Sequence, residues 1–156
     1  MRYITIVVCF LSLSLFSQEN VRTETSKLEE VKSMIKETID AHAFDEDSNK
    51  RRYKAVFEGD KLRLLIMKGD GSKPINKGLL YDFSNVYKFD RLSLRKKEKA
   101  YVNIWLDFLD KENYPKRKKW VKIKLIMKVV GHDKAKIIMD AFKMYNKILV
   151  SNKTDK

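Results

Sequence analysis

The residues best suited to acid–base or metal chemistry lie around His42. Three acidic residues, Asp45, Glu46 and Asp47, follow this histidine closely. Imidazole and carboxylate groups together can hold a metal ion or activate a water molecule. The second histidine, His132, stands far along the chain. We interpret both histidines as helix-end residues, and we keep a small hydrolase or metal-dependent enzyme centred on His42, Asp45 and Asp47 as an alternative hypothesis.

Other catalytic and ligand-binding patterns are incomplete in this sequence. Residues 45–49 match the first, third and fifth positions of a calcium loop, but Lys50 and Val56 occupy the positions that need glycine and glutamate. The glycine pair in residues 69–74 is typical of a turn, and no phosphate-binding glycine motif is present. We therefore favour a non-enzymatic function, and we expect no catalytic residue, no metal ligand and no cofactor.

Basic side chains are the clearest functional signal. The chain has 34 lysines and arginines against 21 acidic residues, a formal charge of +13. Residues 18–50 carry a net charge of −4, and residues 51–156 carry +16. The cations gather in two connections, residues 91–99 and 111–119. A basic surface of this size attracts anionic partners electrostatically.

Aromatic residues accompany these cations. Strand alternation places Trp105 and Trp120 on the solvent-facing side of their strands, among the lysines. Aromatic rings within a basic surface suit an anionic lipid, an anionic polysaccharide or an acidic protein. The candidate binding residues are Lys116, Arg117, Lys118, Lys119, Trp120, Lys122 and Lys124. The alternatives are that the lysines only keep the protein soluble, or that it is a structural envelope protein with no ligand.

Residues 1–17 have the order of charges and apolar residues that is typical of a secretory signal peptide. Arg2 is followed by an uncharged, mostly apolar stretch to Phe16, and small Ser17 precedes polar Gln18. We expect cleavage near Ser17–Gln18 and export to the periplasm, the envelope or the medium. The mature chain then lacks Cys9, the single cysteine, and we expect no transmembrane helix in it. Nucleic acid is a poor partner for an exported protein, and only a cytosolic protein would make it the first one to test.

Hydrophobic periodicity predicts a helix, then strands, then a second helix. Leu28, Val31, Ile35 and Ile39 form one helical stripe. Strands are predicted over 53–58, 62–67, 79–89, 101–109 and 120–130, and the third is interrupted at Ser84–Asn85. Asp133 can cap a terminal amphipathic helix. We expect a single α+β domain over 18–150, with five to six antiparallel strands in a bent sheet or partly open barrel, and a frayed polar tail over 151–156.

This order of elements resembles the pleckstrin-homology-like barrel over residues 52–150. The resemblance implies that the last helix closes one open end of a strongly bent sheet. The N-terminal helix is an addition to that pattern. A cystatin-like or NTF2-like fold, with a helix on a curved sheet, explains the first half of the chain equally well.

Overall fold

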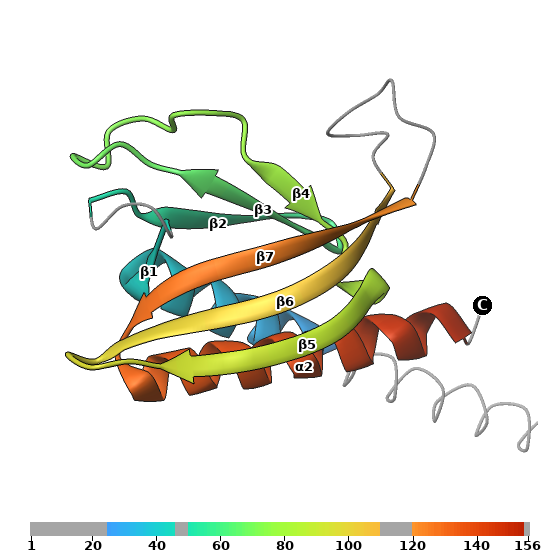
Figure 1. Ribbon diagram of the computed structural model, residues 1–156. Coiled ribbons are helices and arrows are strands. Elements are labelled where there is room, and N and C mark those ends of the chain that lie inside the picture. The colour runs from blue at the N-terminus through green and yellow to red at the C-terminus, as the bar shows by residue number, and fades with distance from the viewer. Residues whose placement is uncertain (1–24, 46–49, 110–119, 155–156) are drawn as a thin grey trace, which may run out of the picture. The chain divides into compact units, whose positions relative to one another are not determined.

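The computed structural model of this chain describes residues 25–45, 50–109 and 120–154 (Figure 1). The chain divides into two compact units, residues 1–30 and 31–156. Within the first unit, the described residues 25–30 are helical. The second unit contains the sheets, the C-terminal helix and every site considered below.

The second unit begins with a helix that continues to residue 42. Val31, Ile35 and Ile39 are buried, as their helical spacing predicts. A carboxylate oxygen of Asp40 accepts a hydrogen bond from the backbone N–H of Ala55 at 2.7 Å. This bond ties the helix to the first long strand that follows.

The strands form two antiparallel sheets, and the α+β class is confirmed. The four-stranded sheet has the order β1-β7-β6-β5, with β1 at Ala43–Phe44, β5 at Val86–Leu94, β6 at Lys99–Leu109 and β7 at Trp120–Val130. The three-stranded sheet has the order β2-β3-β4, with β2 at Tyr53–Glu58, β3 at Lys61–Ile66 and β4 at Leu79–Tyr81. The two sheets do not close into a barrel.

The predicted third strand is two strands that belong to different sheets. β4 ends at Tyr81, a short 3₁₀ helix, η1, covers Phe83–Asn85, and β5 begins at Val86. A carboxylate oxygen of Asp82 accepts hydrogen bonds from the backbone N–H and the hydroxyl of Ser84. This side chain caps the turn at which the chain leaves one sheet and enters the other.

The C-terminal helix, α2, spans His132–Thr154 and packs aromatic side chains against η1 and the three-stranded sheet. The Phe142 ring stacks on Phe83 of η1 at a centroid distance of 4.5 Å. The Tyr145 ring meets Phe57 of β2 edge-on at 5.6 Å. Figure 1 shows α2 running beside β5. The helix continues through Thr154, four residues beyond the predicted boundary at residue 150.

Candidate anionic-partner surface

The four-stranded sheet has one buried face and one partly exposed face. On β6, Ala100, Val102 and Ile104 are fully buried, and on β7 the buried set is Leu125, Met127 and Val129. Alternation places the intervening residues on the opposite side of each strand. We call this opposite side the outer face. It is formed by Lys88 of β5, Tyr101, Asn103 and Trp105 of β6, and Lys124, Ile126 and Lys128 of β7.

Trp105 lies at the centre of a row of three residues across the outer face. The strand register places it opposite Lys88 on one side and opposite Lys124 on the other. The Lys124 ammonium lies 5.4 Å from the centre of the Trp105 ring, which is the geometry of a cation–π contact. The sequence-based expectation that Trp105 lies on the solvent side among lysines is confirmed.

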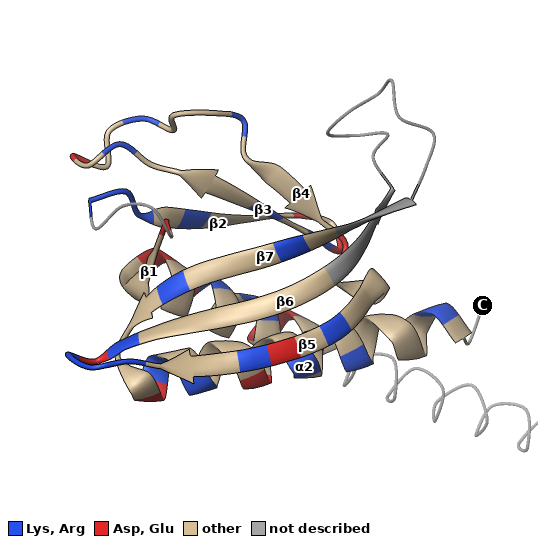
Figure 2. Ribbon diagram, in the orientation of Figure 1, with Lys and Arg blue, Asp and Glu red and all other residues tan. Residues whose placement is uncertain are grey.

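Asp90 supplies a carboxylate that the two lysines of this row share. Its oxygens lie 3.6 Å from the Lys88 ammonium and 3.8 Å from the Lys124 ammonium. Figure 2 shows acidic and basic residues close together along β5. Because two cations share one anion, the row keeps a net positive charge next to an aromatic ring.

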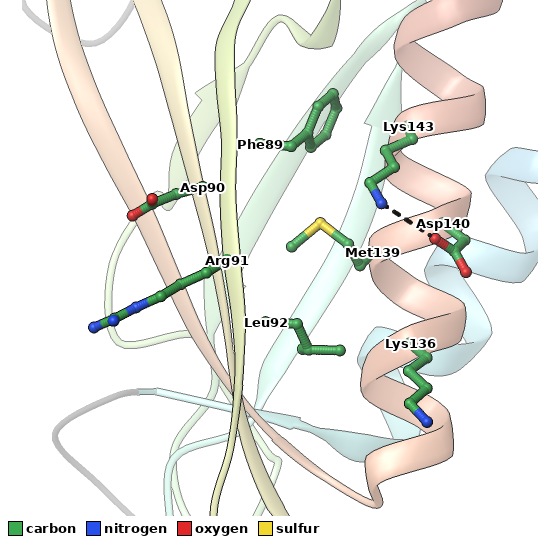
Figure 3. Close-up of a pocket in the computed structure, with 8 residues that line it drawn as sticks. All are labelled: Phe89, Asp90, Arg91, Leu92, Lys136, Met139, Asp140 and Lys143. Carbon is green, nitrogen blue, oxygen red and sulfur yellow. Dashed lines mark hydrogen bonds and ion pairs between the residues drawn. The ribbon is translucent and has the colours of Figure 1, made fainter.

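Asn103 holds an irregularity in β5 that places Asp90 at this row. The pairing of β5 with β6 shifts register between Phe89 and Leu92. The Asn103 amide donates hydrogen bonds to the carbonyl oxygens of Arg91 and Tyr101, each at 3.2 Å. Figure 3 shows Asp90 and Arg91 pointing to the side of β5 that faces away from α2.

The outer face ends in a second group of aromatic and cationic side chains. Tyr101 is paired with Lys128, and Lys128 is paired with Phe44 of β1. The Arg52 guanidinium lies 5.0 Å from the centre of the Phe44 ring. Lys128 is buried, with 5% of its surface exposed, so Arg52 is the accessible cation in this group.

The sequence-predicted binding residues are only partly placed. Lys124 lies on the outer face, as described above. The backbones of Trp120 and Lys122 belong to β7, opposite Leu109 and Asp107, but their side chains lie outside the described part. Residues 116–119, which are Lys116, Arg117, Lys118 and Lys119, lie outside the described residues altogether. Sequence analysis missed Lys88 and Asp90 because the irregular pairing of β5 breaks the alternation that would identify a solvent-facing side.

Both histidines lie at helix ends, as predicted. His42 is the last residue of its helix, and His132 is the first residue of α2. The His132 Nε2 atom lies 2.8 Å from the carbonyl oxygen of Arg95 and 3.1 Å from that of Lys99. Its backbone N–H donates to the Glu98 carboxylate at 3.2 Å. His132 therefore fastens the basic turn between β5 and β6 to the start of α2.

The residues proposed for metal or hydrolytic chemistry are only partly described. Asp47 lies outside the described residues, and the Asp45 carboxylate lies 3.8 Å from the Arg51 guanidinium. Among the described residues, no three histidine, cysteine, aspartate or glutamate side chains gather closely enough to hold a metal ion.

A cleft of about 180 Å³ opens between β5 and α2. Figure 3 shows Phe89 and Leu92 of β5 pointing toward Met139 of α2 across this space. At the helix side, the Lys143 ammonium lies 3.4 Å from the Asp140 carboxylate. The cleft thus has three apolar side chains between the strand and the helix, and Lys136, Asp140 and Lys143 line its helix side.

A second cleft, of about 290 Å³, lies between the β2–β3 turn, η1 and the end of α2. Its acids all have basic partners. Glu58 is hydrogen bonded to Arg63, which lowers the pKa of the glutamate, Asp60 lies 3.3 Å from Lys32, and Asp82 lies 4.0 Å from Lys153. Paired charges therefore line this cleft.

The chain matches no family model, no curated protein and no solved structure. The resemblance to a pleckstrin-homology-like barrel therefore stays a prediction. Of the helices in the described part of the chain, none is long and apolar enough to span a bilayer.

Proposed function

We propose that this chain is a non-enzymatic binding domain whose outer face binds an anionic polysaccharide. The observation that carries the proposal is the row in which Trp105 lies between Lys88 and Lys124. A flat ring can stack against the C–H face of a sugar. The neighbouring ammonium groups can pair with carboxylate or sulfate groups on the same polymer.

The length of the outer face favours a polymer over a small anion. Trp105 and Tyr101 are four residues apart on β6 and project from the same side. At about 3.3 Å per residue, the two rings are separated by about 13 Å along the strand. Two aromatic contacts at this spacing require a ligand longer than a single sugar unit.

We also propose that the protein is exported, since export would bring it into contact with polysaccharides. The apolar N-terminal segment indicates a secretory signal, and an exported basic protein meets acidic polysaccharides and anionic lipids rather than nucleic acid. An acidic protein partner and a structural role without a ligand are the competing outcomes of the experiment below. The hydrolase hypothesis gains no support from His42 and Asp45, because Arg51 already pairs with Asp45.

The proposal is tested by retention on immobilised heparin, a sulfated polysaccharide, in a salt gradient. The double variant Lys88→Ser/Lys124→Ser should elute at clearly lower salt than the parent protein, because it loses two cations beside the Trp105 ring. The matched control is Lys136→Ser/Lys147→Ser, which removes the same charge from exposed positions on α2. Equal loss of retention in both double variants would contradict a specific surface.

Tryptophan fluorescence provides a second and independent measurement. The chain has two tryptophans, so Trp120→Phe leaves Trp105 as the only one. Titration with heparin should then change the Trp105 emission, and Trp105→Ala should weaken retention. Heparin binding that leaves this emission unchanged would place the polysaccharide elsewhere on the molecule.

A further inference from the structure

The connection between β3 and β4 presents an isolated apolar side chain among lysines. Residues 68–77 are all exposed, and they include Lys68, Lys73 and Lys77 but a single acid, Asp70. Ile75 lies between Lys73 and Lys77 in the sequence, and 46% of its surface is accessible to solvent. We call residues 68–78 the β3–β4 loop.

Backbone hydrogen bonds hold the β3–β4 loop in a defined shape. The Ile75 N–H donates to the carbonyl of Ile66 at 2.8 Å, and the Lys68 N–H donates to the carbonyl of Lys73 at 3.0 Å. The Asp70 carboxylate accepts from the backbone N–H and the hydroxyl of Ser72, and these bonds lower the pKa of Asp70. Ile75 is therefore held at the surface by a structured turn.

Further cations lie beside the β3–β4 loop on the segment that leads into β2. The Met67 N–H donates to the carbonyl of Arg52 at 2.8 Å. A Cβ atom placed on Gly69 would lie 3.7 Å from the Cβ of Lys50. Figure 2 shows basic residues on the β3–β4 loop and on the segment that leads into β2. The two segments therefore form one basic surface.

The charge of this surface is strongly positive over the described residues. Arg51 pairs with Asp45, and Arg52 covers the Phe44 ring. The β3–β4 loop itself carries three lysines and one carboxylate: Lys68, Lys73, Lys77 and Asp70. Residues 46–49 lie outside the described part, so their two acids are not counted here.

We propose that this end of the three-stranded sheet docks on an anionic lipid bilayer, with Ile75 inserted at the interface. Lysines near a membrane surface are attracted by anionic headgroups, and an apolar side chain gains from entering the boundary of the acyl chains. A polysaccharide or a nucleic acid would satisfy the lysines, but it offers no apolar phase to Ile75. The proposal goes beyond the polysaccharide surface because it uses residues of the other sheet.

The test is co-sedimentation of the whole protein with vesicles. Vesicles that contain phosphatidylglycerol should bind the protein at low salt, while vesicles of phosphatidylcholine alone should bind it much less. Lys73→Ser/Lys77→Ser should reduce the bound fraction, and Lys136→Ser/Lys147→Ser on α2 should change it much less. This comparison separates the local surface from the net charge of the protein.

Ile75→Ser tests insertion. It should weaken binding to phosphatidylglycerol vesicles by roughly tenfold, since the serine variant loses the burial of an aliphatic side chain. The control is Val150→Ser, because Val150 of α2 is exposed to nearly the same degree as Ile75, 44% against 46%. Equal affinity of the Ile75→Ser variant and the parent protein would overturn the proposal, as would equal binding to the two vesicle types.

Heparin retention separates the two proposals. Lys73→Ser/Lys77→Ser should lower vesicle binding more strongly than heparin retention, and Lys88→Ser/Lys124→Ser should do the reverse. If the loop variant lowers heparin retention and leaves vesicle binding unchanged, the loop is a polysaccharide site and the membrane proposal is wrong. Melting temperatures near that of the parent protein would show that each variant is folded.

Discussion

Asn146 links α2 to the point where the chain passes from one sheet to the other. Its side-chain amide donates a hydrogen bond to the backbone carbonyl of Phe83 at 2.7 Å. Phe83 is fully buried and stacks on Phe142 of the same helix. One residue of η1 is thus held by α2 through both an aromatic stack and a hydrogen bond.

We predict that Asn146→Ala lowers the free energy of unfolding by about 1–3 kcal/mol, because it leaves a partly buried carbonyl without its donor. Urea denaturation measures this loss. Lys147→Ala is the control, since Lys147 is exposed and next in sequence, and it should change stability by less than about 0.5 kcal/mol. Similar losses in the two variants would show that the Asn146 hydrogen bond contributes little.

Asp90 is the reason that the outer face is not simply basic. Asp90 lies near both Lys88 and Lys124, and it partly neutralises the row around Trp105. Such ion pairs on a surface are individually weak and are screened by salt. An anionic ligand would compete with Asp90 for these lysines, so retention on heparin should depend steeply on salt.

At the scale of elements, β5 is an edge strand that is poorly suited to pairing with another chain. It lies at the end of the four-stranded sheet and pairs with β6 through two shifts of register. Lys88, Asp90 and Arg91 place charges along it. Charges and irregular pairing are common ways to prevent edge-to-edge association, so we expect ligands to reach this sheet by its face.

Gly78 determines how the β3–β4 loop joins β4. Its φ is +67°, and a Cβ atom there would lie 2.3 Å from the carbonyl oxygen of Leu64. A left-handed backbone favours glycine, and in addition there is no space here for a methyl group. The close approach of Gly78 to β3 therefore fixes the start of β4.

We predict that Gly78→Ala destabilises the protein more than Gly71→Ala. Both glycines have positive φ, but a Cβ on Gly71 would meet nothing within 4 Å. Gly71→Ala should cost about 1–2 kcal/mol from backbone strain alone, and Gly78→Ala should cost clearly more because the backbone of β3 must also move. Equal midpoints of urea denaturation for the two variants would contradict the steric argument.

At the scale of the whole molecule, charge is distributed unevenly along the chain. Residues 18–50 have a net charge of −4, while residues 51–156 have +16. Within the second unit, the two basic surfaces lie on different sheets. One is the outer face around Trp105, and the other is the β3–β4 loop with its neighbours. The two proposals together predict that the protein binds a membrane and an acidic polymer at separate surfaces.

We predict that the protein is exported after its signal peptide is removed. The intact mass of the native protein, measured in separated cell fractions, should correspond to a chain that begins near Gln18, found in the envelope or the medium. The signal peptide would have been removed together with Cys9. A full-length mass in the cytosol would contradict export and make nucleic acid the first partner to test.

Local sequence patterns are enough to predict most of the elements and their buried faces. The alternation in residues 101–105 and 123–129 predicts which side of β6 and β7 is buried, and the stripe at Val31, Ile35 and Ile39 does the same for the first helix. These predictions succeed because the repeat of a strand or helix is local. Successive buried side chains are two positions apart in a strand and three or four positions apart in a helix.

The way in which these elements combine depends on contacts between distant parts of the sequence. It divided the predicted third strand between two sheets, placed Lys88, Trp105 and Lys124 in one row, and brought Lys50 beside Gly69. Strand pairing joins residues that are far apart in sequence through backbone hydrogen bonds. Every residue type except proline can donate such a bond from its N–H and accept one at its carbonyl oxygen. Register therefore leaves little trace in the local sequence, and both candidate surfaces depend on it.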